Sequence, residues 1–173
     1  MKTIVIGTLL LLLGACGFRP MMGSGALDGD IVEQMGAVEI SEIKDHIGQQ
    51  LRNMLIDRFY HNQRSGKPKY RLDVILNTKE SALTIEKDAT ATGGLLISSA
   101  NYRLVHIASG KIVLQGFSNA VPGYKISNYQ WASFVSQADA AERGIEYMSN
   151  DIRSRVALYF ARAPDQKPPM ARD

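Results

Sequence analysis

Two segments of the chain carry apolar residues at the spacing of an amphipathic helix. In residues 43–59 they recur at steps of three and four, with polar residues on the opposite side. Ser41 is placed to cap this first helix, which we expect to end near His61, before the loop NQRSGKPK. A second stripe over residues 135–159 predicts a longer helix that ends at about Ala161.

Between these two helices the apolar period changes to two, which is typical of strands with one apolar face. The alternation begins at Tyr70 and continues through Leu72, Val74 and Leu76, with Arg71 on the polar side. The sequence ASGK supplies a Gly for a hairpin turn between two later strands. The strands expected from this pattern lie at residues 37–40, from Tyr70 onward, with a further short strand segment at 82–86, and at 95–106 and 112–121.

The predicted order of elements is β-α-β-β-β-α. It favours an α+β fold, a two-layer sandwich with two helices packed on one face of a four-stranded mixed sheet. The other face of the sheet would then meet solvent or a partner. TGG at residues 92–94 predicts a turn or a bulge, and YKISNYQWAS at 124–133 a loop or a ragged helix start.

The first 15 residues have the layout of a secretory signal peptide: Lys2, an apolar run over residues 4–13, and then small residues. That run is too short to span a bilayer as a helix. The sequence LGAC, which ends at Cys16, resembles a bacterial lipobox. This resemblance implies a diacylglycerol on the Cys16 sulfur and acylation of its new amino group by chains such as palmitate. The alternative is a small buried Cys in an apolar helix.

The chain therefore divides into a signal peptide (1–15), a lipidated tether (16–36), one α+β domain (37–161) and a tail (162–173). Gly and Pro break any apolar period in the tether, and three prolines in the last eleven residues predict a disordered tail. A chain of 173 residues has room for one domain with its own hydrophobic core. Because Cys16 is the single cysteine, this domain would have no internal disulfide.

Composition and motifs do not favour an enzyme. The formal net charge of +3 is too small to indicate a nucleic-acid partner. The three histidines, His46, His61 and His106, lack the spacing of metal ligands. Ser118 lies in GFSNA, which lacks the second Gly of a nucleophile elbow. We therefore expect no catalytic residue, no metal and no cofactor.

Four basic residues stand out by position: Lys79, Lys87, Arg103 and Lys125. Such side chains can bind the phosphates of an anionic lipid headgroup while nearby Leu and Ile contact acyl chains. The alternative is an ordinary solvated surface.

Aromatic residues gather before the second helix. Exposed aromatics at a loop-helix junction suit a protein interface, but a helix start packed into its own core would have the same composition. Both interpretations stay open for these residues, Tyr124, Tyr129, Trp131 and Phe134.

The order and spacing of several segments, together with the lipobox, resemble the LPS-assembly lipoprotein family (LptE), in particular its alphaproteobacterial members. The resemblance implies a lipoprotein without catalytic activity, anchored in the outer membrane on the periplasmic side. It also implies a plug inside the LPS-transport β-barrel (LptD) that helps the barrel to assemble and binds lipopolysaccharide. The segments that carry the likeness are GFRP after the lipobox, YRLDVIL (70–76), ANYRLVHIASGKIVLQG (100–116) and residues 118–160.

The same resemblance implies which residues contact lipopolysaccharide. Lys87 is the best match for a basic residue between the middle strands, and Lys125 is the nearest basic residue to a second position at the start of the last helix. Arg103 and Lys79 complete the expected set. Gly17, directly after the acylated Cys, is consistent with transfer to the outer membrane.

Two other functions remain alternatives. A periplasmic lipoprotein hydrolase would need Ser118 to meet a histidine and an acid in space. A purely structural envelope lipoprotein would need no site at all.

Overall fold

The computed structural model describes residues 26–60, 66–85 and 91–162, with side chains described for 29–60, 66–81 and 93–162. The predicted signal peptide, Cys16, His61, Lys87 and the tail after Arg162 lie outside these ranges. The chain separates into a unit that ends at Asp30 and a unit that begins at Ile31, and the sheet and its covering helices belong to the second unit.

The described elements form a mixed sheet with helices packed on it, which confirms the predicted α+β class. The strand order is β1-β2-β3-β4, and β5 pairs with β3. β1 runs parallel to β2, whereas all the other pairs are antiparallel. In chain order the elements are α2 (Ala26–Gly36), β1 (Val38–Ile40), α3 (His46–Phe59), β2 (Tyr70–Ile85), β3 (Ala91–His106), β4 (Ile112–Ala120), β5 (Gly123–Lys125) and α4 (Gln130–Ala161).

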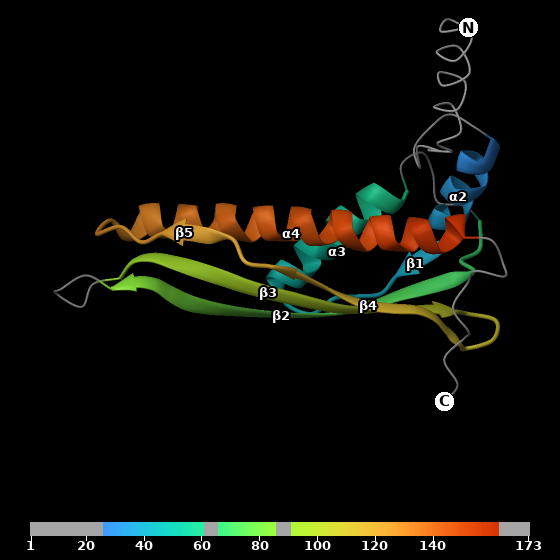
Figure 1. Ribbon diagram of the computed structural model, residues 1–173, viewed down its shortest axis with the longest axis horizontal. Coiled ribbons are helices and arrows are strands. Elements are labelled where there is room, and N and C mark those ends of the chain that lie inside the picture. The colour runs from blue at the N-terminus through green and yellow to red at the C-terminus, as the bar shows by residue number, and fades with distance from the viewer. Residues whose placement is uncertain (1–25, 61–65, 86–90, 163–173) are drawn as a thin grey trace, which may run out of the picture. The chain divides into compact units, whose positions relative to one another are not determined.

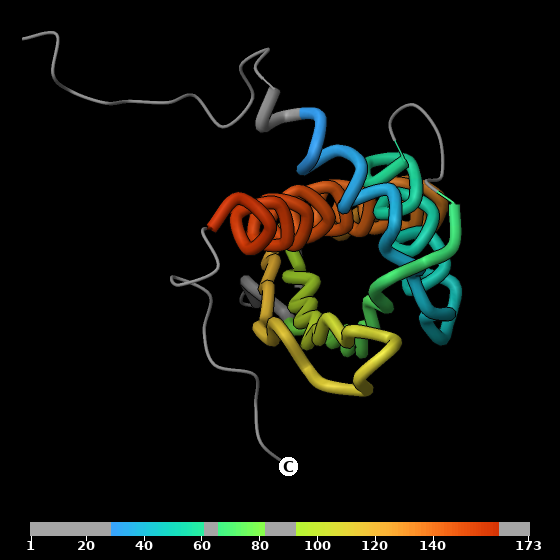
Figure 2. The backbone as a smooth tube through the Cα atoms, turned by 90° about the vertical axis from the view of Figure 1, so that its right-hand side faces the viewer, coloured from blue at the N-terminus to red at the C-terminus, as the bar shows by residue number. Residues whose placement is uncertain are grey.

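Helices α3 and α4 lie together on one face of the sheet, which we call the inner face (Figure 1). The view turned by 90° shows the same two helices side by side above the strands (Figure 2). The apolar periods predicted from the sequence meet here: even-numbered residues of β2 and β3 point inward, and the helical stripes face them. The fully buried side chains of this core include Leu51, Leu55, Leu72, Leu104, Ile145, Met148, Ile152 and Val156.

Several predicted boundaries are confirmed. Helix α4 ends at Ala161, and β3 and β4 form the predicted hairpin, with Gly110 at φ 69° in its turn. That positive φ strains a residue with a Cβ atom, so Gly suits the position. TGG was predicted to form a turn or a bulge, and the register of β2 against β3 shifts beside Gly93 and Gly94, as a bulge does.

The sheet also differs from the prediction. The stretch from Tyr70 and the separate strand at 82–86 are one continuous strand, β2. Residues 77–81 are polar, but they contain no Gly or Pro that would end a strand. Most of them are exposed, so the strand continues here without alternating apolar residues. Strand β3 begins at Ala91 rather than near residue 95, and β5 occupies part of the predicted loop.

The helical boundaries differ at two places. Residues 26–36, expected within the tether, form α2, because Ile31 and Met35 lie one helical turn apart and both pack on the core. Helix α3 begins at His46, after Asp45 at φ 68°, so Ser41 is not its cap. The Ser41 hydroxyl bonds to Asp73 instead.

Candidate functional site

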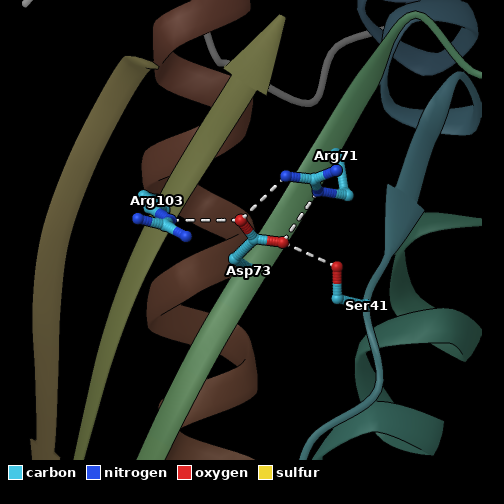
Figure 3. Close-up of polar contacts among 4 residues, drawn as sticks. All are labelled: Ser41, Arg71, Asp73 and Arg103. Carbon is cyan, nitrogen blue, oxygen red and sulfur yellow. Dashed lines mark hydrogen bonds and ion pairs between the residues drawn. The ribbon is translucent and has the colours of Figure 1, made fainter. Parts of the chain in front are cut away.

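On the outer face of the sheet, away from α3 and α4, one carboxylate holds two arginines (Figure 3). Asp73 accepts from Arg71 Nε at 2.9 Å and from Arg103 Nε at 3.1 Å. The Ser41 hydroxyl donates to the same carboxylate at 2.7 Å. We call these four residues the Asp73 cluster.

The register of the strands creates this cluster. Asp73 lies directly opposite Arg103 in the β2–β3 ladder, and Arg71 is two residues earlier on the same face of β2. Ser41 follows β1 directly and lies beside β2. The sequence pattern predicts Arg71 on the polar face, but the pairing of Asp73 with Arg103 depends on the register and could not be read from the pattern.

The Asp73 carboxylate stays ionised because of these partners. Partial burial on its own raises the pKa of Asp73, but the hydrogen bonds from Ser41, Arg71 and Arg103 outweigh burial and lower the pKa below its usual range. One negative and two positive charges leave the cluster with a net positive charge. Both guanidinium groups are about half exposed and can donate further hydrogen bonds to an anion such as a phosphate.

The lowered pKa of Asp73 predicts how the stability of the domain changes with pH. In the native state Asp73 releases its proton at a lower pH than in the unfolded chain, so its contribution is complete above the unfolded pKa, near 3.8. That contribution is lost as the pH falls through the lower, folded pKa. We expect Asp73→Asn to lower the free energy of unfolding at pH 7, and its difference from wild type to shrink below pH 4. Urea denaturation of the wild type and of Asp73→Asn at pH 7, 5, 4 and 3 measures the free energy of unfolding of each protein.

Glu142→Gln is the matched control, because Glu142 is an exposed carboxylate on α4 and the pKa of Asp73 does not depend on it. A difference between Asp73→Asn and wild type that stays constant from pH 7 to pH 3 would contradict the assigned role of Asp73.

Apolar side chains are exposed beside the cluster on the outer face. Ile75 and Phe117 lie on either side of Asn101 in one row across β2, β3 and β4, and both are exposed. Ile97 and Val121 are exposed further along the sheet. The sequence predicted that this face meets solvent or a partner, but it did not predict that apolar side chains gather on it. The face therefore combines guanidinium groups with apolar surface.

The structure does not gather the other predicted basic residues around Arg103. Lys79 lies opposite Ile97, six residues from Arg103 along β3, which is roughly 20 Å at the rise of a strand. Lys125 lies in β5 opposite Gly93, roughly 30 Å from Arg103 along the same strand. Lys79 and Lys125 are both exposed. The three cations thus line the sheet and do not form one pocket.

A second surface lies at the start of α4. Tyr129, Trp131 and Phe134 are 79%, 75% and 59% exposed, and the rings of Trp131 and Phe134 stack with centroids 5.8 Å apart. Val135 is also exposed. We call these four residues the aromatic patch. Of the two interpretations of this segment, a helix start packed into its own core does not hold for these residues, because their side chains are exposed.

Hydrogen bonds hold the backbone below the aromatic patch. The Ser127 amide donates to Ser133 Oγ at 2.7 Å, and the Ser133 hydroxyl donates to the Ser127 carbonyl at 3.0 Å. The Lys125 amide donates to Ser136 Oγ at 2.9 Å. These bonds tie the loop to the first turns of α4, so the aromatic rings stand on an ordered support.

Tyr124 has a different role from the other aromatic residues. Its ring lies over Gly94, where a Cβ atom would be 2.4 Å from the Tyr124 ring carbon Cζ. Its hydroxyl donates to Glu80 at 3.3 Å. Burial and the negative charge of Glu80 raise the pKa of Tyr124. Tyr124 therefore fixes β5 to the sheet, and Gly94 provides the space for its ring.

The residues considered for catalysis are not joined in the structure. Ser118 is buried in β4, and its hydroxyl has no hydrogen-bond partner in the described part of the chain. His46 begins α3, and His106 Nδ1 bonds to Ser109 Oγ at 2.9 Å. Among the residues with described side chains, no three His, Cys, Asp or Glu groups are placed to hold a metal ion. None of the helices in the described ranges is long and apolar enough to cross a membrane.

Comparison with known proteins gives structural neighbours only. No protein-family model and no curated protein sequence matches the chain. A candidate lipoprotein from Caulobacter crescentus CB15 is similar over 80% of this chain and 98% of its own, with a TM-score of 0.63 and 23% identity. A minor lipoprotein from Acinetobacter baumannii is similar over 78% and 96%, with a TM-score of 0.53 and 16% identity. Rare lipoprotein B from Shewanella oneidensis is similar over 72% and 92%, with a TM-score of 0.50 and 14% identity.

At these identities the likeness concerns the fold. The chain has the fold of several bacterial lipoproteins, and it covers nearly the whole length of each of the three.

Proposed function

We propose that this chain is an outer-membrane lipoprotein, anchored on the periplasmic side, that acts as a non-catalytic subunit of the lipopolysaccharide translocon. In this role it plugs an LptD-type β-barrel, helps the barrel to assemble and binds lipopolysaccharide. The lipobox at Cys16 and the fold shared with bacterial lipoproteins support the envelope location.

The observation that carries the subunit role is the aromatic patch. Large aromatic side chains exposed on an ordered support are costly in a monomer and are typical of the energetic centre of a protein interface.

The proposed lipopolysaccharide site is the outer face of the sheet. Arg103 and Arg71 can bind phosphates through their exposed guanidinium groups, and Ile75 and Phe117 offer apolar surface for acyl chains. Lys79 and Lys125 extend the positive charge along the same sheet. Lys87 lies outside the described residues, and it is included among the proposed lipopolysaccharide contacts on the basis of the sequence alone.

The subunit role predicts the outcome of a co-purification experiment. The tagged, full-length protein is purified in detergent from outer membranes, and a large β-barrel is expected at a one-to-one ratio. The double change Trp131→Ser and Phe134→Ser should reduce the bound barrel at least tenfold, because it removes the stacked pair from the centre of the interface.

Tyr147→Ser is the matched control, since Tyr147 is also exposed on α4 but lies outside the aromatic patch. We expect this control to retain the barrel. A wild-type protein that purifies alone would contradict the subunit role and favour a purely structural envelope lipoprotein.

A further inference from the structure

One edge of the sheet is open over most of the length of β2. β1 pairs only with the first residues of β2, from Val38 opposite Tyr70 to Ile40 opposite Leu72 (Figure 1). The last bond of this ladder joins the Ser41 amide to the Leu72 carbonyl at 3.0 Å. Beyond Leu72, no described strand lies on this side of β2. We call residues 73–81 the open edge.

The direction of the backbone groups follows from that last bond. The Leu72 carbonyl points toward β1, and along a strand the N–H and C=O groups alternate between the two sides. The even-numbered residues after Leu72 therefore direct their N–H and C=O groups away from β3, toward the open side. They form a row of main-chain donors and acceptors at Val74, Leu76, Thr78 and Glu80.

The open edge has few of the features that keep edge strands from pairing. Natural edge strands are usually short, or carry Pro, bulges or inward-pointing charges. The sequence of residues 73–81, DVILNTKES, contains no Pro or Gly, and the irregular pairing begins only at Ala82. Lys79 points to the outer face, and Glu80 is held by Gln137 of α4. By contrast, the other edge strand, β4, packs against α4 and contains Gly116.

A cavity lies on the inner face beside the open edge. It has a volume of about 470 Å³, and Thr78 and Glu80 of β2 form one side of it. Ile47 of α3 lines another part, and Leu96 and Phe134 contribute further apolar surface. A strand added along the open edge would extend the sheet beneath α3. Its inward side chains at the level of Thr78 would then lie next to this cavity.

These two features together favour an extended strand with apolar side chains as the occupant. Phe134 belongs to both the cavity and the aromatic patch, so the open edge adjoins the proposed barrel interface. We propose that the open edge of β2 receives an extended strand of the barrel subunit, paired through the main chain at residues 74–80, with apolar side chains directed into the cavity. This inference rests on the proposed function, since it names the barrel as the source of the strand. A closed barrel has no free strand edge, so the added strand belongs to a loop or a terminal segment of that subunit.

A proline at Thr78 tests the main-chain pairing. The Thr78 amide points to the open side, so Thr78→Pro removes no ladder bond within the free protein but removes a donor needed by an added strand. Thr78→Val is the matched control, because both changes remove the hydroxyl that bonds to Ser98 Oγ and only the proline removes the amide. With the full-length lipidated protein, we expect Thr78→Pro to retain at least tenfold less barrel, and Thr78→Val to retain the wild-type amount.

Hydrogen exchange of the wild-type protein gives a second readout that does not depend on folding of the proline variant. The amides of Val74, Leu76, Thr78 and Glu80, which point to the open side, should exchange at least tenfold more slowly in the purified complex than in the free lipoprotein. If the barrel co-purifies but these amides exchange at the same rate, the inference is overturned and the proposed function stands. If the barrel does not co-purify with the wild-type protein, both are overturned.

Discussion

Replacing Cys16 by Ala is expected to release the protein from the membrane. The proposed anchor consists of two or three acyl chains, and each buried methylene contributes about 0.8 kcal/mol to membrane binding. We therefore expect the fraction in the membrane pellet to fall by about two orders of magnitude.

The design of this experiment separates anchoring from processing. Cys16→Ala is combined with a cleavable signal peptide that is not of the lipoprotein type, so that export and cleavage proceed without acylation. The protein is produced in large excess over any barrel, so that a partner can retain only a small fraction. The control keeps Cys16 and its own signal peptide. A Cys16→Ala protein that remains in the pellet after washing would show that another part of the chain binds the membrane.

The parts of the fold that could be predicted are those set by local periodicity. The long stripe that became α4 repeats over more than twenty residues, so its period is clear and its end at Ala161 was predicted correctly. The β3–β4 hairpin was predicted for a similar reason, because Gly110 lies between two alternating segments. In each case the signal lies within one continuous stretch of chain.

The parts that could not be predicted depend on contacts between distant segments. Asp73 meets Arg103 because of a strand register, and Ser41 reaches Asp73 because β1 lies beside β2. Helix α2 lies in a stretch interrupted by Gly, and its burial depends on Ile31 and Met35 packing on a core formed later in the chain. Exposure is equally non-local, since Phe117 and a core residue such as Val113 look alike in the sequence.

The inferred surfaces lie on different sides of the same scaffold. The Asp73 cluster and the exposed Ile75 belong to the outer face of the sheet, whereas the aromatic patch belongs to a helix on the inner face. A subunit that held a lipid on one face and a barrel on the other would need such a division. Substitutions on the outer face should then affect lipopolysaccharide binding without loss of the barrel, and substitutions in the patch should do the opposite.

Ile152→Ala is expected to destabilise the domain strongly. Ile152 is fully buried on α4, within the core that joins the helices to the sheet. Truncating such a side chain removes its apolar contacts and leaves a cavity, which lowers the free energy of unfolding by about 2–5 kcal/mol. Urea denaturation monitored by circular dichroism measures this difference, and we expect the midpoint to fall with an unchanged slope.

Leu158→Ala is the matched control on the same helix. Leu158 is exposed, and Ala favours the helical conformation at least as well as Leu, so its effect should stay within about 0.5 kcal/mol. Equal losses at the two positions would mean that α4 does not pack on the sheet through the face assigned here. Because α4 also carries the aromatic patch at its other end, Ile152→Ala should weaken barrel binding only under conditions where the domain itself begins to unfold.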